Sequence, residues 1–350
     1  MSVNATSGIE NATASAAMFW EPRENGAAVC TLCPHLCHIG EGLYGVCGVR
    51  RNTGGKIETL IYGLSAAMNV DPIEKKPLFH FLPASKSLSI ATVGCNFKCA
   101  FCQNYDISQV SKGKNREIFG RAVSPGEIVA LAKKSGSATI AFTYSEPTIF
   151  YEYAHDCARL ASEEGIRGVF VSNGFICEEP VRAIRPYVHA YNVDLKSFNP
   201  TYYKKVVGAR LEPVLEAIKI IKEIGFWLEI TTLVVPTQND SDEELTQIAE
   251  FVAAVGKDIP WHVSAFHPDY KMTDLPRTSV ASLRRAREIG FRAGLEYVYS
   301  GNIPGDDGES TYCPGCKTKL IHRIGFRVLT NRLRDGKCPD CGKAIAGVWK

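Results

Sequence analysis

Three closely spaced cysteines provide the strongest chemical signal in this chain. Cys95, Cys99 and Cys102 have the spacing C-x3-C-x2-C, and a phenylalanine stands directly before the last of them. A closed structural metal site uses four ligands, whereas a reactive site keeps one position open. Thiolates are the usual ligands of iron–sulfur clusters, and three of them on a cubane 4Fe–4S cluster leave one iron free to bind another molecule. The alternatives are a loop of buried thiols and three ligands of a four-ligand zinc site.

Seven segments are predicted to be strands, and the cysteine loop follows the first of them. They cover residues 88–93, 138–143, 168–172, 190–195, 227–235, 262–266 and 296–300. Helical patterns lie between most of these strands, and repeated strand–helix units predict parallel strands with right-handed crossovers. Six or seven units fit a partial (open) TIM-type β/α barrel better than a closed barrel of eight. The sequence therefore predicts an α/β fold of this kind.

Three helices carry recognisable end signals. Ser124 and Glu127 stand at the N-cap and N3 positions of the first helix, the arrangement of a capping box. The second helix covers residues 213–224 and is followed by Gly225, a common residue after a helix end. The third covers residues 241–255 and opens with acidic side chains, which the helix dipole favours.

Polar residues follow or end most of the predicted strands. In barrels of this type, the site lies at the C-terminal ends of the strands. The segments are Tyr144-Ser145-Glu146-Pro147, Ser172-Asn173-Gly174, Asp194-Leu195-Lys196, Thr231-Thr232, His267-Pro268-Asp269 and Ser300-Gly301-Asn302. Each has an ordinary alternative, since Glu146 could cap a helix, Asn173 could form only a turn, and Asp194 and Lys196 could form a surface ion pair. Their common position on one rim favours a shared site.

The cysteine spacing, with its aromatic residue, resembles the signature of the radical S-adenosylmethionine (radical SAM) superfamily. The resemblance implies that Cys95, Cys99 and Cys102 hold a 4Fe–4S cluster and that its open iron is chelated by the amino and carboxylate groups of S-adenosylmethionine. It also implies that one electron from the cluster splits the sulfonium and leaves a 5′-deoxyadenosyl radical. The fold of that superfamily is an open β/α barrel, which agrees with the strand pattern.

The segment from Cys95 to His267 is similar to the glycyl-radical-enzyme activases, such as pyruvate formate-lyase activating enzyme. Tyr144-Ser145-Glu146-Pro147 stands at their Gly-Gly-Glu-Pro, Ser172-Asn173-Gly174 at Thr-Asn-Gly, Asp194-Leu195-Lys196 at Asp-Leu-Lys, and Val234-Val235-Pro236 at Val-Val-Pro. By that resemblance, the residues expected beside S-adenosylmethionine are Tyr144, Ser145, Glu146, Asn173, Asp194, Lys196, Thr231 and His267. A carboxylate suits the ammonium group of this cofactor and a lysine suits its carboxylate.

Two departures from the activase pattern concern the binding of the cofactor. Thr231 stands where the activases carry an arginine in the fifth strand, and Val171 stands where they carry an acid before Thr-Asn-Gly. We therefore expect the cofactor's carboxylate, and any bound cation, to be held differently here.

Thirteen cysteines are many for 350 residues, and eleven of them fall into three clusters. Because no export signal is recognisable, clustered cysteines indicate metal binding rather than disulfides. The first cluster is Cys30, Cys33, Cys37 and Cys47, with glycines around the last of them. Four thiolates suit zinc or an iron–sulfur cluster. We expect a structural metal site here, with an auxiliary redox cluster as the alternative.

The last cluster has the spacing C-x2-C, 21 residues, C-x2-C, and consists of Cys313, Cys316, Cys338 and Cys341. This spacing is close to that of zinc ribbons, small units that depend on their metal for folding. Zinc is the expected occupant and rubredoxin-type iron is the alternative. The two cysteines outside the clusters, Cys157 and Cys177, are expected to be packed thiols.

Both flanking clusters, with residues 299–302 leading to Thr311-Tyr312-Cys313, resemble the AmmeMemoRadiSam-system radical SAM family, which is related to the pyruvate formate-lyase activases. The resemblance covers about residues 25–350. It implies the cofactor chemistry and the small Cys-rich metal-binding appendages at both ends, but it implies no substrate.

The expected organisation has four parts: a disordered lead-in over 1–24, an N-terminal four-cysteine metal-binding region over 25–84, the radical SAM barrel over 85–305 and a C-terminal four-cysteine knuckle over 306–350. The formal net charge of +3 predicts no nucleic-acid partner. No apolar run approaches the ~18 residues of a membrane helix, and the N-terminus lacks the pattern of a signal peptide. We therefore expect a cytoplasmic protein without a membrane or nucleic-acid partner.

The leading functional hypothesis is an enzyme that cleaves S-adenosylmethionine reductively and removes hydrogen from an unknown small-molecule or protein substrate. Such chemistry needs a low-potential electron donor of the ferredoxin or flavodoxin type, and it allows for protein partners of the same system. One alternative is an activating enzyme that installs a glycyl radical on a pyruvate formate-lyase-like partner. An alternative of another class is a zinc-rich scaffold or binding protein without enzymatic activity.

Overall fold

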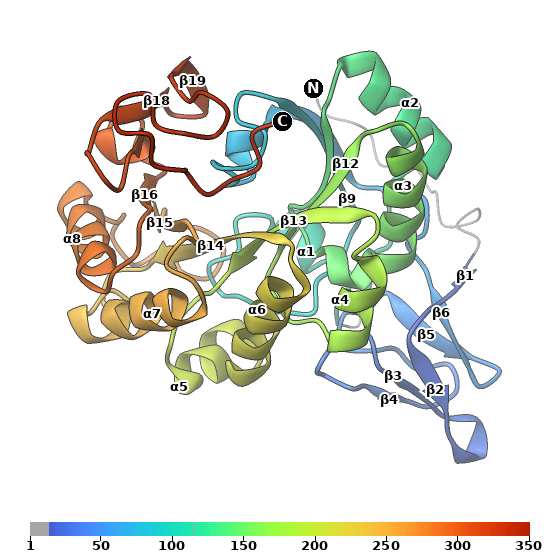
Figure 1. Cartoon of the computed structure of the whole chain (residues 1–350). Helices are drawn as coiled ribbons and strands as arrows, with labels where there is room; N and C mark the ends of the chain where they lie inside the picture. Colours follow the sequence, from blue (N-terminus) through green and yellow to red (C-terminus); the bar gives the residue numbers. More distant parts are fainter. Residues whose placement is uncertain (1–13, 114) are drawn as a thin grey trace.

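A computed structural model describes residues 14–113 and 115–350 (Figure 1). The central sheet has eight strands: β8 (Ala67–Pro72), β9 (Lys86–Ala91), β11 (Thr139–Phe142), β12 (Arg167–Ser172), β13 (Val188–Asp194), β14 (Trp227–Val234), β15 (Trp261–Ala265) and β16 (Val298–Gly301). Their order is β16-β15-β14-β13-β12-β11-β9-β8. Strand β9 and strands β11 to β16 pair in parallel, whereas β8 is antiparallel to β9.

All seven strands predicted from the sequence are present in this sheet. Within the described residues, the edge strands β8 and β16 do not pair with each other, so the barrel is open. The predicted α/β fold with a parallel sheet is therefore confirmed. Each parallel strand ends on the same rim, because parallel strands joined by helical crossovers all point the same way.

Helices cover the outer side of the curved sheet (Figure 1). They are α2 (Pro125–Ser135), α3 (Tyr151–Glu163), α4 (Glu178–Ile184), α5 (Pro200–Tyr202), α6 (Glu212–Ile224), α7 (Asp242–Val255) and α8 (Val280–Arg292). The short helix α1 (Tyr105–Ser108) instead follows the cysteine loop. A π-helical turn, Tyr203–Val207, continues α5. Every residue of β11 and β15 is buried, as expected for parallel strands covered on both faces.

The predicted helix ends are confirmed. At the start of α2, Ser124 Oγ accepts a hydrogen bond from the Glu127 backbone N–H, and the Glu127 carboxylate accepts one from the Ser124 N–H. Helix α6 is followed by Gly225, whose φ of 89° lies in the left-handed region that favours glycine. Ser241 caps α7 through the N–H of Glu244.

The N-terminal part forms small antiparallel sheets beside the barrel, drawn in blue in Figure 1. Their strands are β1 (Ser15–Ala16), β2 (Trp20–Pro22), β3 (Ala28–Cys30), β4 (His38–Ile39), β5 (Arg50–Thr53), β6 (Lys56–Thr59) and β7 (Leu64–Ser65). Strand β7 pairs with β10 (Arg121–Ala122), which comes from the segment after the cysteine loop. Of the lead-in expected over residues 1–24, residues 1–13 lie outside the described residues, whereas β1 and β2 are ordered strands. They are held in part by the Met18 N–H, which donates to Glu152 Oε1 at 2.7 Å.

Strand β8 extends the main sheet at its antiparallel edge, where the sequence pattern predicts no strand. Asp71 lies in β8 and is buried, whereas most residues of the strand are half-buried or exposed. Its carboxylate accepts hydrogen bonds from Lys76 Nζ at 2.7 Å, Lys75 Nζ at 3.0 Å and Ser89 Oγ at 3.1 Å. Because the buried position of β8 carries an acid instead of an apolar residue, the usual alternation of a strand is hidden in the sequence.

The C-terminal part packs beside β16, on the opposite side of the molecule from the N-terminal sheets (Figure 1). It contains β17 (Thr311–Tyr312), β18 (Lys319–Ile324) and β19 (Arg327–Asn331) in one antiparallel sheet. The Val348 N–H donates to the His80 carbonyl at 2.7 Å, and the Leu82 N–H donates to the Val348 carbonyl at 2.7 Å. The residues near the chain end are therefore bonded to the segment that leads into the barrel.

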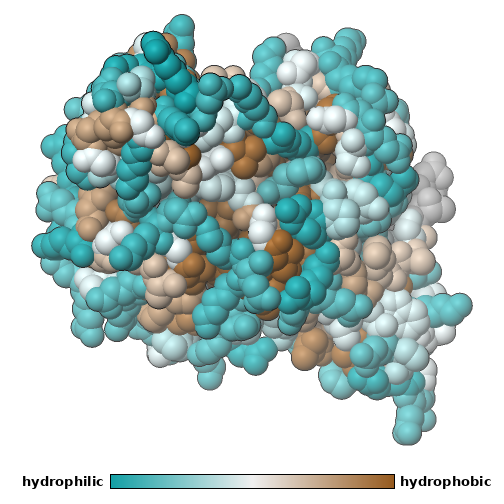
Figure 2. All heavy atoms as spheres, in the orientation of Figure 1, coloured by the Kyte–Doolittle hydropathy of each residue, from teal (hydrophilic) through white to brown (hydrophobic). Residues whose placement is uncertain are grey.

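Hydrophilic residues are spread over the face of the molecule shown in Figure 2, and apolar residues form smaller patches between them. The mean hydropathy of the chain is −0.07. In the described part of the chain, no helix combines the length and the apolar character needed to cross a membrane.

Candidate functional site

The cysteine loop, residues 95–102, follows β9. Hydrogen bonds from its backbone N–H groups hold it in place. The Lys98 N–H donates to the Val207 carbonyl at 2.8 Å, and the Ala100 N–H donates to the Val206 carbonyl at 3.0 Å. Both carbonyls belong to the π-helical turn after α5, a local irregularity that is common at functional sites. The loop is thereby held against a segment more than 100 residues away in sequence.

The three thiols differ in their exposure. Cys95 and Cys99 are buried, whereas Cys102 is half-buried. Burial raises the pKa of the Cys95 thiol and raises that of Cys99 to about 12. The Phe97 N–H donates to Cys95 Sγ at 3.3 Å. Because thiolates are the species that bind metals, occupation of this site must release protons.

The three cysteines line one cavity of about 300 Å³ at the rim of the barrel. Within the described residues, their sulfurs do not form a group in which all ligand atoms lie within 4.8 Å of one another. In a polynuclear cluster, each thiolate binds a different iron atom, so its ligands stand apart. The donor type and the separation therefore fit a three-cysteine iron–sulfur cluster.

The cavity contains seven of the eight residues expected beside S-adenosylmethionine. They are Tyr144, Ser145, Glu146, Asn173, Asp194, Lys196 and Thr231. The eighth residue, His267, is exposed and lines an adjoining cavity. Its Nδ1 donates to the neighbouring Pro268 carbonyl at 2.8 Å. The structure thus places His267 beside the cavity of the cysteines and not in it.

Glu146 is almost completely buried and is held by a set of protein donors. Its Oε1 accepts from the Thr148 N–H at 3.0 Å, the Thr148 hydroxyl at 2.7 Å and the Ser172 hydroxyl at 2.8 Å. Among the described residues, its Oε2 accepts one hydrogen bond, from the Asn173 N–H at 2.8 Å. Burial raises the pKa of Glu146 and these hydrogen bonds lower it, but burial has the larger effect and the net pKa is raised. Glu146 therefore does cap a short helix, as the alternative interpretation predicted, but Oε2 retains capacity for a ligand.

Asn173 connects the third strand end with the cysteine loop. Its Nδ2 donates to Asn96 Oδ1 at 2.8 Å and lies 3.8 Å from Cys95 Sγ. Its Oδ1 accepts from the Phe175 N–H at 2.9 Å. Asn173 thus forms the turn that the alternative interpretation predicted and also positions the loop of the first cysteine.

Asp194 and Lys196 form an ion pair in the wall of the cavity. Lys196 Nζ lies 2.6 Å from Asp194 Oδ2. Burial alone would lower the pKa of Lys196, but the Asp194 carboxylate and the Cys99 sulfur outweigh it, and the net pKa is raised. The lysine is therefore charged, and the pair presents one acidic and one basic group to a zwitterionic ligand. This is not the exposed surface pair of the alternative interpretation, because the Lys196 side chain is only 15% exposed.

Tyr144 combines a strained backbone with a fixed side chain. Its φ is 64°, in the left-handed region that bulky residues rarely adopt, which costs about 1–3 kcal/mol. Its hydroxyl donates to Asp71 Oδ2 and lies 3.4 Å from Lys76 Nζ. The Asn104 side chain donates to the Tyr144 carbonyl at 2.8 Å. The hydrogen bonds from both sides maintain the strained turn at the mouth of the cavity.

The two departures from the activase pattern both lie in the cavity wall. Thr231 and Val171 line it, and Thr231 Oγ1 donates to Asn192 Oδ1 at 2.9 Å. The threonine hydroxyl is thus occupied by a neighbouring strand, and it carries no charge. Three lysines line the cavity, and Lys196 is the one at a strand end. It is therefore the lysine placed to bind the carboxylate of the cofactor.

The buried pair His262 and Glu229 lies at the cavity and was not predicted from the sequence. His262 lines the cavity, and its Nε2 lies 2.6 Å from Glu229 Oε2. Burial would raise the pKa of Glu229, but the hydrogen bond and charge of His262 keep it below the usual value. Glu229 is therefore an acceptor and His262 Nε2 the donor. The parallel register pairs His262 with Thr231, a predicted site residue. Aligning the two predicted strands could therefore have identified His262 as a site residue.

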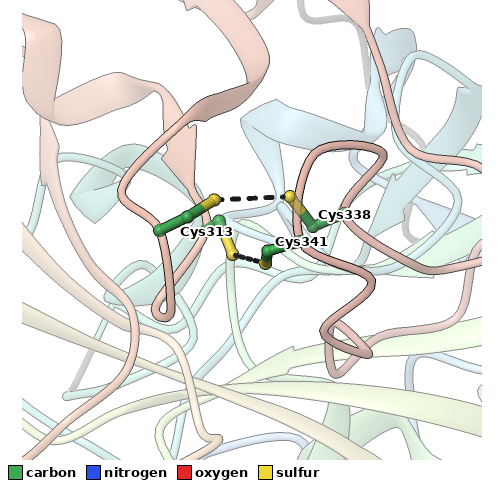
Figure 3. Close-up of side chains that lie close together, drawn as sticks. Cys313, Cys338 and Cys341 are labelled. Carbon is green, nitrogen blue, oxygen red and sulfur yellow. Dashed lines mark hydrogen bonds between the residues drawn. The ribbon is translucent and has the colours of Figure 1, made fainter.

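The C-terminal cysteines form a compact ligand set. The sulfurs of Cys313, Cys316, Cys338 and Cys341 all lie within 4.8 Å of one another. Cys313 lies 3.6 Å from Cys341, and Cys316 lies 3.6 Å from Cys338. Figure 3 shows the labelled side chains pointing toward a common centre from two separate turns. Four thiolates at this separation fit one tetrahedral metal ion, because a Zn–S bond of ~2.3 Å implies sulfur separations of about 3.8 Å.

The N-terminal cysteines lie together in a different arrangement. Cys30, Cys33, Cys37 and Cys47 line one small cavity between the N-terminal sheets and the cysteine loop. Burial and the neighbouring sulfurs raise the pKa of Cys33. The two cysteines outside the clusters are packed thiols as expected: Cys157 is fully buried in α3 and Cys177 is half-buried before α4.

A protein-family model described as the radical SAM superfamily matches residues 89–251. This range includes the cysteine loop and the predicted site residues up to Thr231. An uncharacterised protein of Methanocaldococcus jannaschii is 43% identical over 332 residues, which are 94% of this chain and 98% of that protein.

More distant similarities concern the barrel. The pyruvate formate-lyase 1-activating enzyme of Escherichia coli is 22% identical over 221 residues, 59% of this chain and 89% of that protein. A solved structure of a radical SAM methyltransferase from Sphaerobacter thermophilus is similar with a TM-score of 0.50 and 18% identity, over 65% of this chain and 71% of that one. At this identity the structural match supports the fold alone.

Proposed function

Because residues 89–251 match the model of the radical SAM superfamily, we propose that this chain is an enzyme that binds a 4Fe–4S cluster and S-adenosylmethionine at the rim of its barrel. When bound, these groups supply the one-electron cleavage of the sulfonium to methionine and a 5′-deoxyadenosyl radical that takes a hydrogen atom from the substrate. The observation that carries the proposal is one shared cavity. It is lined by Cys95, Cys99, Cys102, Glu146, Asn173, Asp194 and Lys196.

The protein side chains supply complementary charges for a zwitterion. Lys196 is a buried cation suited to a carboxylate, and a charge-assisted hydrogen bond of this kind is about twice as strong as a neutral one. Asp194 and Glu146 Oε2 are acceptors suited to an ammonium group. Thr231, which is neutral and already bonded to Asn192, leaves Lys196 to take the role that an arginine has in the activases.

Part of the cavity wall is apolar. Apolar side chains alternate there with the polar groups: Phe79, Phe97, Phe101, Leu233 and Phe326. A site in which few water molecules remain strengthens the electrostatic contacts and protects reactive species from side reactions. This lining supports a reaction carried out by a radical.

We propose a small molecule or a residue of a protein as the substrate. Glycyl-radical activation is the second candidate, and it is favoured by the similarity to the activating enzyme of Escherichia coli over 59% of the chain. The C-terminal cysteine unit extends beyond the barrel and favours the first candidate. A radical doublet in the electron paramagnetic resonance (EPR) spectrum of a glycyl-radical enzyme, after incubation with this protein, would decide for activation.

Binding of S-adenosylmethionine can be tested without turnover. We expect the EPR signal of the reduced cluster to change when S-adenosylmethionine is added, because its amino and carboxylate groups would join the open iron. Cys102→Ala should lose this response to S-adenosylmethionine, whereas Cys177→Ala should keep it. An intact three-cysteine cluster whose signal is unaffected by S-adenosylmethionine would contradict the proposal.

A further inference from the structure

We infer that Cys30, Cys33, Cys37 and Cys47 hold a second 4Fe–4S cluster and not a single zinc ion. This goes beyond the proposed function, because those cysteines lie outside the family match and outside the cavity at the barrel rim. The inference rests on the spacing of the sulfurs, on a buried cation in the same cavity, and on the contact between this site and the cysteine loop.

The spacing of the sulfurs separates the three cysteine sets of this chain into two types. In the C-terminal set, the four sulfurs lie within 4.8 Å of one another, as one tetrahedral ion requires. Among the described residues, no three sulfurs of the N-terminal set meet that condition. In this respect they behave like the cysteine loop, in which each thiolate is expected to bind a different iron atom. The C-terminal set of the same chain thus shows how closely four sulfurs lie when they suit a single ion.

The N-terminal sulfurs nevertheless share one enclosed space. All four cysteines line the same cavity, and three of them are buried. The Val46 N–H donates to Cys37 Sγ at 3.4 Å. Enclosure and N–H···S hydrogen bonds are the features by which proteins hold iron–sulfur clusters and set their potentials. Separated thiolates around one closed space fit a polynuclear occupant.

Arg50 provides an independent sign of an anionic occupant. It lines the cavity and is 1% exposed. Its Nη1 lies 3.0 Å from Glu152 Oε1, and its Nη2 donates to the Met18 carbonyl. Its Nε has no hydrogen-bond partner within the described residues. A buried N–H is rarely left unpaired, and a cation here compensates the negative charge of four thiolates around a bound metal centre. Arg50 therefore indicates that the site is occupied, and the sulfur spacing distinguishes a cluster from a single zinc ion.

The site adjoins the cysteine loop through two contacts. Asn96, which follows Cys95, lines the cavity, and its carbonyl accepts a hydrogen bond from His35 Nε2 at 2.8 Å. On the other side, the Ser111 hydroxyl donates to the Cys47 carbonyl at 2.8 Å. The occupant would therefore be a one-electron centre directly behind the loop of the proposed catalytic cluster.

Close packing at two glycines confirms that this contact is built into the fold. A Cβ on Gly48 would lie 1.9 Å from the Ser111 carbonyl oxygen, and a Cβ on Gly94 would lie 2.8 Å from Val49 Cγ1. Both glycines have positive φ, +77° and +100°. The turn after Cys47 and the residue before Cys95 therefore approach each other as closely as glycine allows.

The occupant can be identified in a protein that lacks the first cluster. In the variant Cys95→Ala/Cys99→Ala/Cys102→Ala, prepared without oxygen, we expect half of the wild-type iron and acid-labile sulfide to remain. A reduced-cluster EPR signal should also remain. Adding Cys30→Ala and Cys37→Ala should remove both, whereas adding Cys177→Ala should leave them unchanged.

The contradicting result is equally specific. If the triple variant contains no acid-labile sulfide and two zinc ions per chain, the N-terminal site is a zinc site and the inference is wrong. If the variant with all five substitutions fails to fold, the triple variant alone decides between a 4Fe–4S cluster and a zinc ion. Absence of iron from the cysteine loop of the wild type, with iron and sulfide retained in the triple variant, would contradict the proposed function but not this inference.

Discussion

His35 Nε2 lies 2.8 Å from the carbonyl oxygen of Asn96. A carbonyl can only accept, so Nε2 carries the proton and donates. Burial lowers the pKa of His35, which agrees with a neutral ring that has one N–H. This bond joins the first cysteine motif to the loop that contains Cys95, although the two are 61 residues apart in sequence. Two segments that look separate in the sequence therefore form one structural unit.

Removal of this bond should weaken the retention of the proposed catalytic cluster. His35→Ala leaves the Asn96 carbonyl without its partner, at a cost of about 1–3 kcal/mol for an unpaired buried group. We expect the cluster of the cysteine loop to be lost several-fold faster in air, measured as the decay of the EPR signal that responds to S-adenosylmethionine. His38→Ala is the matched control because His38 is exposed. Equal decay rates in the two variants would contradict the account.

Lys196 should be important for the binding of S-adenosylmethionine. Lys196→Gln removes the buried charge but keeps a side chain of similar length. Loss of a hydrogen bond to a charged group costs about 1.5–3 kcal/mol, so the dissociation constant should rise about 10- to 100-fold in equilibrium dialysis with the loaded protein. Lys133→Gln removes an exposed lysine with a surface ion pair and should change nothing. An unchanged affinity in Lys196→Gln would exclude this residue from the binding site.

The C-terminal ligand set should contain one zinc ion that is independent of the iron. Cys316 and Cys341 are exposed, so Cys316→Ser/Cys341→Ser removes two ligands without a cavity in the core. We expect loss of one zinc per chain and a lower melting temperature, because such a unit depends on its metal for folding. The iron and sulfide content should not change. One iron atom without sulfide in place of zinc would identify a rubredoxin-type site instead.

Stability should fall in mild acid because of His80. Its ring is fully buried: Nδ1 donates to the Ala346 carbonyl at 2.6 Å, and Nε2 accepts from the Tyr299 hydroxyl. Burial lowers the pKa of His80 to about 4, compared with about 6.5 in the unfolded chain. Between these values the unfolded state binds more protons, so the free energy of unfolding decreases as the pH falls.

This contribution amounts to at most about 1.4 kcal/mol per pH unit in that window and is absent above it. Denaturant unfolding of the metal-loaded protein from pH 7.5 to pH 5 would measure it. His80→Gln should show a shallower dependence, whereas His38→Gln should follow the wild type. If His80→Gln keeps the full slope, other groups are responsible for the acid sensitivity.

The barrel and its rim were predictable because their signals are local. Apolar strand segments, the capping box at Ser124 and the glycine after α6 each specify an element within a few residues. The order of the strands then follows from parallel crossovers, and it brings Glu146, Asp194 and Lys196 to one rim. The three cysteines needed only their spacing to be recognised.

The remaining parts of the site depend on contacts that no short segment encodes. Asp71 occupies a buried strand position normally filled by an apolar residue, so the strand pattern of β8 is hidden in the sequence. His262 is one residue of a buried strand, and its partner Glu229 lies 33 positions earlier. His267 follows β15 as expected, but it is exposed, and neighbouring residues line the cavity in its place. Such placements become visible only in three dimensions.

The most direct test of the account is the formation of 5′-deoxyadenosine. The protein would be loaded with iron and sulfide without oxygen, reduced with dithionite and supplied with S-adenosylmethionine, beside Cys99→Ala and the control Cys157→Ala. We predict 5′-deoxyadenosine and methionine in the wild type and in Cys157→Ala, and neither product in Cys99→Ala. Equal product formation in Cys99→Ala, or zinc in place of an iron–sulfur cluster at Cys95, Cys99 and Cys102, would contradict it.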